Sequence, residues 1–175
     1  MPTGQASRDP GPNDPRIVDA SRFQPRRRRQ LSGPGLRTFL NIADEWQLSE
    51  QERLRVLGFP ARSTFHGWVA KVRQRTDITL SVDELIRISV VLGIYKALKI
   101  VFPREEDAVR WLRAPNAGPA FGGQAPLALI TSGTQDALML VRRYLDAWRG
   151  GTFGAPVPGF DDAVAPLSDA DLAFV

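Results

Sequence analysis

The chain has 175 residues, of which 43% are hydrophobic, and its formal net charge is +4. It holds no cysteine and a single histidine, so disulfide frameworks, thiolate zinc sites and sites built from several histidines are excluded. Redox enzymes, cysteine proteases and most metalloenzymes are thereby excluded, and we expect no catalytic residue, no metal and no cofactor.

The charge is distributed unevenly along the chain. Residues 1–34 carry seven arginines against three aspartates, together with six prolines, whereas residues 151–175 carry four aspartates and no basic residue. Such compositions are typical of extended or disordered segments. The run of four arginines at Arg26–Arg29 has two open interpretations, a solvated tail or a segment that contacts DNA phosphates.

The first helical pattern starts at Leu36. Apolar residues at Leu36, Phe39, Leu40 and Ala43 follow the i, i+3, i+4, i+7 spacing of one helix face. We expect this helix to end near Gln47.

Two short helices are expected next, on either side of a Gly-Phe-Pro turn. Ser49 is a candidate N-cap for the first helix, and Gly58 fits the C′ position after it. The second helix, at residues 62–73, has an apolar stripe that includes Phe65 and Trp68, and its other positions are rich in basic residues.

A short helix, a turn and a basic helix together fit a helix-turn-helix motif, whose second helix contacts DNA. His66 is also open to interpretation as an ordinary surface residue. The candidate DNA-binding residues are Arg62, Ser63, Thr64, His66, Lys71, Arg73 and Arg75.

A long apolar helix is expected from its N-cap Ser81 to about Val101. Gly93, in its middle, lowers helix stability by roughly 1 kcal/mol relative to Ala, which indicates close packing of another helix or chain. Arg87 and other charges interrupt the apolar run, so it is a core helix and not a membrane span. Since the polar, Pro-rich start of the chain has no signal-peptide pattern, we expect a cytoplasmic protein and no membrane partner.

The last third of the chain is also predicted to be helical. Acidic residues 105–107 open a short helix that buries Trp111, and a loop rich in Pro and Gly follows it. Pro126 is placed to start a helical turn, and Thr134 is placed to cap a last helix that ends at Gly150. No segment shows the alternation of a β-strand, so the predicted fold class is all-α.

This order of elements resembles the Xre/MbcA/ParS antitoxins. The resemblance covers residues 50–152 and rests on an ordered set of short motifs. These motifs are Ser63-Thr64 with Trp68, Phe102-Pro103, Trp111-Leu112, Pro115-Asn116, the segment from Gly122 to Leu127, the break at Gly133, and the terminal helix that closes on Gly150.

The resemblance implies a cognate RES-domain toxin, which in this family degrades NAD. It also implies a homodimer within a hetero-oligomeric toxin–antitoxin complex, and repression of the chain's own operon through operator DNA. In this family the end of the last helix and the residues after it occlude the toxin's active site. Carried onto this chain, that contact falls on Arg142, Arg143, Asp146, Arg149, Gly150, Gly151, Thr152 and Phe153.

We therefore expect an all-α antitoxin with four parts: a disordered basic arm at residues 1–34, a helix-turn-helix-like domain at 35–80, a toxin-binding and dimerisation domain at 81–152, and an acidic flexible tail at 153–175. The alternative is a helix-turn-helix transcriptional regulator whose C-terminal domain serves only for dimerisation. An exposed apolar patch between residues 138 and 153 favours the antitoxin, because a simple regulator should bury it.

Overall fold

The computed structural model describes residues 24–150, and within that range the chain forms helices and no strand. This confirms the all-α prediction; the expected acidic tail and most of the expected basic arm lie outside the described residues. The helices are α1 (Pro25–Glu45), α2 (Glu50–Val56), α3 (Arg62–Arg73), α4 (Val82–Val101), α5 (Glu105–Arg113), α6 (Pro126–Ile130) and α7 (Gln135–Gly150).

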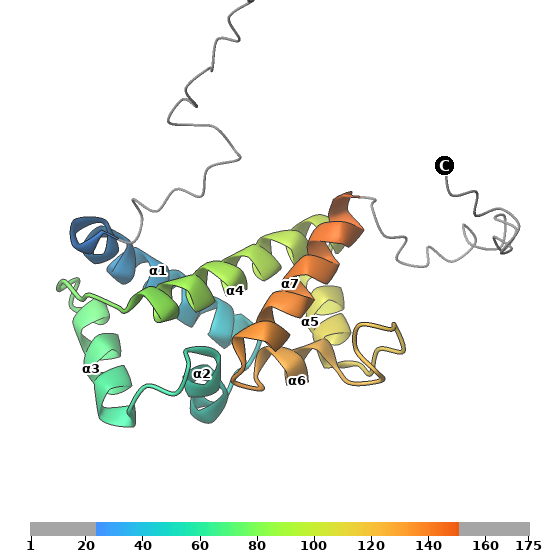
Figure 1. Cartoon of the computed structure of the whole chain (residues 1–175), viewed down its shortest axis with the longest axis horizontal. Coiled ribbons are helices and arrows are strands. Elements are labelled where there is room, and N and C mark those ends of the chain that lie inside the picture. Colours follow the sequence, from blue (N-terminus) through green and yellow to red (C-terminus); the bar gives the residue numbers. More distant parts are fainter. Residues whose placement is uncertain (1–23, 151–175) are drawn as a thin grey trace, which may run out of the picture.

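The long helix α4 lies in the middle of the molecule (Figure 1). It packs against α1 on the side that carries α2 and α3, and against α7 on the side that carries α5 and α6. Its buried side chains, among them Val91, Ile94 and Leu98, join the same core as Phe39 of α1 and Leu145 of α7. Both halves of the chain therefore share one continuous core built around α4.

The predicted N-caps Ser49, Ser81 and Thr134 are confirmed. Ser49 and Ser81 each form a capping box, in which the serine hydroxyl accepts from the backbone N–H three residues on. Glu52 and Glu84 accept the cap N–H in return. The Thr134 hydroxyl accepts from the Ala137 N–H at 3.4 Å at the start of α7.

The start of α1 corrects the sequence analysis, which placed residues 25–34 in a disordered arm and began the helix at Leu36. Pro25 occupies the first turn of α1, where its missing N–H is not needed, and Pro34 is accommodated inside the helix. Ser32 explains why this segment is ordered: its buried hydroxyl donates to the Arg28 carbonyl at 2.7 Å and accepts from the Leu80 N–H at 2.9 Å. A tertiary contact with the α3–α4 connection thus overrides the local signal of proline and glycine.

Arg87 of α4 joins the α2–α3 turn to the α6–α7 turn. Its guanidinium donates to the Gly133 carbonyl at 3.0 Å and to Asp83 at 2.7 Å. A Cβ atom at Gly58, in the α2–α3 turn, would lie 2.9 Å from Arg87 Nε. The Phe59 ring lies against Gly133, whose positive φ of 94° and missing side chain leave room for it.

None of the helices between residues 24 and 150 is long and apolar enough to cross a bilayer. The expected domain limits, 35–80 and 81–152, stay predictions; α4 packs against helices on both sides of the division.

Candidate functional site

The first candidate surface is the outer side of α3. Phe65 and Val72 are buried and fix this helix to the core, and Trp68 and Val69 pack against the same core. This leaves the rest of the helix to solvent. The seven expected DNA-binding residues all lie on exposed positions of α3 or directly after it: Arg62, Ser63, Thr64, His66, Lys71, Arg73 and Arg75.

The centre of the exposed side of α3 is smooth, in the sense that it carries only small side chains. Ser63, Gly67 and Ala70 follow the i, i+4, i+7 spacing of one face, opposite to Phe65 and Val72. A Cβ atom added at Gly67 would meet nothing within 4 Å. The fold itself therefore does not require a glycine there, although glycine inside a helix lowers stability by about 1 kcal/mol relative to alanine. A glycine at such a position suits the close approach of another molecule.

Glu50, at the start of α2, holds two of the seven residues. Its carboxylate accepts from Arg62, with Nη2 at 2.6 Å, and lies 3.0 Å from His66 Nε2. The hydrogen bond with His66 and, next, the one from Arg62 hold the pKa of Glu50 below its usual value. This role of Glu50 could not be predicted from the sequence, because an acid in the first turn of a helix is already explained by the helix dipole.

The second candidate surface is the C-terminal half of α7, where three expected toxin-contact residues form one ion-pair cluster. Arg142 Nε lies 2.6 Å from Asp146 Oδ2, and Arg149 Nη2 lies 3.6 Å from Asp146 Oδ1. The spacings i, i+4 and i, i+3 place the three side chains on neighbouring positions of the helix surface. Asp146 thus holds two guanidinium groups near the end of α7.

The Arg142 side chain of this cluster packs directly over Gly93 of α4. A Cβ atom at Gly93 would overlap the guanidinium of Arg142, so only glycine leaves space for it. This confirms the expectation that close packing of a neighbouring helix explains the glycine. The sequence could not name Arg142 as the neighbour, because 49 residues and two helices separate the two positions.

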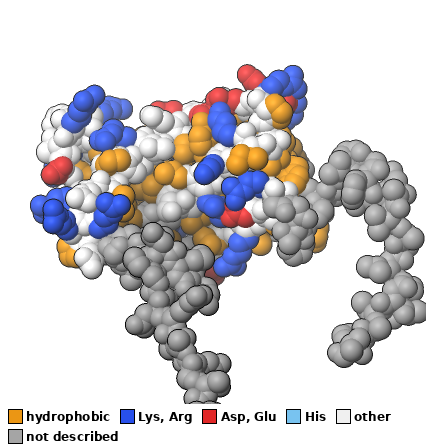
Figure 2. All heavy atoms as spheres, turned by 90° about the horizontal axis from the view of Figure 1, so that it is seen from above, with side chains coloured by type: hydrophobic (Ala, Val, Ile, Leu, Met, Phe, Trp, Pro, Cys, Tyr) orange, Lys and Arg blue, Asp and Glu red, His pale blue; other side chains and the backbone are white. Residues whose placement is uncertain are grey.

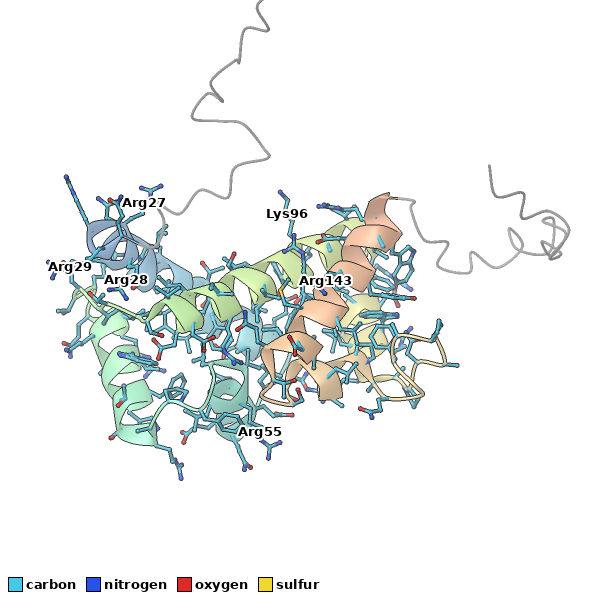
Figure 3. All side chains as sticks on the ribbon, viewed as in Figure 1. Arg27, Arg28, Arg29, Arg55, Lys96 and Arg143 are labelled. Atoms are coloured by element: carbon cyan, nitrogen blue, oxygen red, sulfur yellow. The ribbon has the colours of Figure 1, made fainter. Side chains whose placement is uncertain are left out.

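The remaining expected contacts are dispersed. Arg143 of α7 and Lys96 of α4 are both exposed, and Lys96 extends above α4 in Figure 3. Gly150 is the last residue of α7. Gly151, Thr152 and Phe153 lie outside the described residues.

Aromatic rings pack against the C-terminal half of α7. Trp148 packs edge-on against Phe102 with ring centroids 5.5 Å apart, and Trp111 stacks on Tyr144 at 6.2 Å. Phe121 completes the cluster with an edge contact to Tyr144 at 4.7 Å. Burial raises the pKa of the Tyr144 hydroxyl. Trp111 and Trp148 therefore act as packing residues, as expected, and they set the direction in which α7 ends.

Apolar surface lies beside these positions. Leu140 of α7 is 38% exposed and Ile100 of α4 is 55% exposed. Seen from above, hydrophobic side chains run across the middle of the face formed by α1, α4 and α7 (Figure 2). A groove of about 500 Å³ lies in this face, lined by Leu31, Pro34, Gly35, Thr38, Leu85, Ile86, Ile88, Ser89, Val90, Leu92 and Met139.

Comparison with known families matches both parts of the molecule. The antitoxin Xre-like helix-turn-helix domain matches residues 25–92, which include all of α1, α2 and α3. The antitoxin Xre/MbcA/ParS C-terminal toxin-binding domain matches residues 97–151, which include α5, α6 and α7. The two matches meet inside α4, so this helix is shared between them.

Among curated proteins, the chain is similar to the uncharacterized protein y4oB of Sinorhizobium fredii. The two sequences are 41% identical over 116 residues, which is 66% of this chain and 84% of that protein. No solved structure matches the chain.

Proposed function

The chain belongs to the Xre/MbcA/ParS antitoxins, and from this premise we propose that it inhibits a RES-domain toxin by occluding the toxin's active site with the end of α7. The family has a toxin as its partner and carries a helix-turn-helix domain. The nature of the toxin, the residues of the contact and repression of the chain's own operon belong to the proposal.

The observation that carries the toxin proposal is the packing of the Arg142 guanidinium over Gly93. The cluster of Arg142, Asp146 and Arg149 gives the end of α7 a fixed set of charged groups directly before Gly150. A pocket that takes NAD recognises phosphate and carboxamide groups. A polar chain end that contains glycines is narrow enough to enter such a pocket and exclude its substrate.

The exposed surface of α3 supports the proposal that the chain binds operator DNA. Its outward face is made of small residues, and basic side chains border it on both sides. A helix of this kind fits the major groove, where small side chains allow a close approach and basic ones bind phosphates. Repression of the chain's own operon would follow from binding at its promoter.

Formation of a homodimer within the toxin complex also stays a proposal. The apolar groove between α1 and α4 is available for a second copy of the chain. The alternative function, a regulator that lacks a toxin partner, is disfavoured by the match of residues 97–151 to a toxin-binding domain. The exposed Leu140, within the stretch where an apolar patch was expected, agrees with this.

The test is to purify the tagged full chain from its native cells and identify the protein that co-purifies. We expect a RES-domain protein in stoichiometric amount, which degrades NAD after the two are separated. Adding back the full chain should suppress that activity, whereas a chain truncated after Arg149, which keeps Trp148 in the aromatic cluster, should remain folded and fail to suppress it. Suppression by the truncated chain would contradict occlusion by the end of α7, and recovery of DNA alone would contradict the toxin partner.

A further inference from the structure

A track of arginines leads from the end of α3 onto α1. Arg73 is the last residue of α3, and Arg75 follows two residues later. Arg37 and Arg29 lie on α1, and all four side chains are exposed. In Figure 3, Arg29 lies on the side of α1 that faces the α3–α4 connection.

Two adjoining hollows connect these residues. The first, of about 530 Å³, is lined by Arg29, Arg37 and Arg75. The second, of about 670 Å³, lies between α1 and α3 and is lined by Arg37, Arg73 and Arg75. Because Arg37 and Arg75 belong to both, the hollows form one continuous surface that runs from the flank of α3 along α1.

The arginines of α1 are spaced as a stripe. Arg26, Arg29, Gly33 and Arg37 follow the spacing of one helix face. With a rise of 1.5 Å per residue, the stripe is about 16 Å long. A row of positive charges of this length matches an extended anion with regularly repeated charges, such as the phosphate backbone of a DNA strand.

Acidic groups in the two hollows form no ion pair with the arginines of the track within residues 24–150. Asp77 lines the first hollow, and Asp44 and Glu50 line the second. Asp44 is paired with Arg53 at 2.7 Å, and Glu50 is occupied by Arg62 and His66. Within residues 24–150, no carboxylate lies at ion-pair distance from the guanidinium groups of the track.

We propose that Arg29, Arg37 and Arg75 bind the phosphate backbone of the DNA whose major groove is occupied by α3. The proposal rests on the DNA binding proposed above and extends the contact surface from the flank of α3 onto α1. Contacts of this kind fix the position of a protein on DNA and carry no sequence information of their own.

The structure also separates the members of the Arg26–Arg29 run. Arg29 lines the first hollow, whereas Arg27 lines neither hollow and donates to the Gln30 side chain at 3.3 Å. Arg27 and Lys96 therefore provide a matched control, because both are exposed cations outside the track.

The experiment compares the full chain with the variant Arg29→Gln/Arg37→Gln and the control Arg27→Gln/Lys96→Gln, each of which loses two charges. Binding is measured by fluorescence anisotropy over a series of salt concentrations. The probes are a duplex from the region upstream of the chain's own gene and a duplex with its sequence shuffled. For the track variant, we expect the slope of log affinity against log salt to fall by about 2. Affinity for both duplexes should fall by a similar factor, about tenfold or more, and the control should keep the slope of the unaltered chain.

An unchanged slope in the track variant, or an equal change in the control, would overturn the proposal. So would a loss of discrimination between the duplexes at constant overall affinity, because it would indicate base recognition. If the unaltered chain binds neither duplex, the DNA-binding part of the proposed function fails first and this inference with it. Circular dichroism checks the fold of each variant. If the double variant is unfolded, Arg75→Gln, which lies in a connection, replaces it and should lower the slope by about 1.

Discussion

At the scale of single residues, Glu50 shapes the candidate DNA-binding surface although it carries the wrong charge for DNA. It holds Arg62 and His66 in place through hydrogen bonds, and these bonds lower its own pKa. The carboxylate therefore stays charged at neutral pH and fixes both side chains beside the smooth face of α3. DNA phosphates must compete with Glu50 for these two residues, whereas Lys71 is free of such competition within residues 24–150.

The fold does not require a glycine at position 67. Replacing it should therefore stabilise the protein and weaken DNA binding. The substitution Gly67→Ala should raise the free energy of unfolding by about 1 kcal/mol, because alanine favours the helix and meets no neighbour. It should also weaken DNA binding severalfold, because the added methyl group lies where the DNA approaches. Urea denaturation and fluorescence anisotropy measure the two effects.

Ala70, on the same face of α3, supplies the control. Ala70→Gly should lower the free energy of unfolding by a similar amount and leave DNA binding close to that of the unaltered chain, since it adds no atom to the surface. A Gly67→Ala variant that binds DNA as tightly as the unaltered chain would show that DNA does not approach this face.

At the scale of elements, the position of α7 on α4 decides what the end of α7 presents. The two helices run in the same direction (Figure 1), with Gly93 against Arg142 and, further along, Phe102 against Trp148. Because Gly93 has no side chain, the charged Arg142 side chain of α7 can lie across the surface of α4. The aromatic contact then fixes the last turn before the expected toxin-contact residues.

Because Arg142 of α7 packs over Gly93 of α4, a substitution at Gly93 should change toxin binding by α7. Gly93→Ala should displace the Arg142 guanidinium and weaken binding of the toxin recovered with the chain by about tenfold, with little loss of stability because alanine favours α4. Titration calorimetry with the isolated toxin measures the change. If Gly93 acts through Arg142, then Gly93→Ala should have little further effect once Arg142 has been replaced by Ala. Full additivity of the two substitutions would show that Gly93 serves some other purpose.

At the scale of the whole molecule, the two family domains are joined by more than a shared helix. The α2–α3 turn of the helix-turn-helix domain touches the α6–α7 turn of the toxin-binding domain through Phe59 and Gly133. Arg87 donates to the Gly133 carbonyl of the α6–α7 turn, lies beside Gly58 of the α2–α3 turn, and has a side chain that is only 11% exposed. The start of α3 and the start of α7 are therefore held in a fixed relation to each other.

Arg87→Gln should lower the free energy of unfolding by about 2 kcal/mol, because the Arg87 side chain is largely buried and the substitution removes its charge-assisted hydrogen bonds to Gly133 and Asp83. Urea denaturation measures the effect. Arg110→Gln serves as the control: it also breaks an arginine–aspartate pair, but the side chain is 73% exposed, so the stability should change little. Equal effects in the two variants would contradict a structural role for Arg87 at the junction.

Several elements could be predicted from the sequence because their signals are local. The capping serines, Gly58 after α2 and the apolar stripe of α3 each depend on neighbours within one or two helical turns. The start of α1 was predicted wrongly for the same reason. Its prolines and glycines are local signals against a helix, and the contact that outweighs them comes from Leu80, 48 residues away.

The sequence by itself determined the helical class, the order and most limits of the helices, and the membership of the antitoxin family, since spacing and capping are written into short stretches of chain. Only the tertiary structure decided that Gly93 holds Arg142, that Glu50 holds Arg62 and His66, and that arginines of α1 and α3 meet along one track. The physical reason is that these contacts join residues far apart in the chain. Such contacts depend on how helices pack around α4, and no local pattern records that packing.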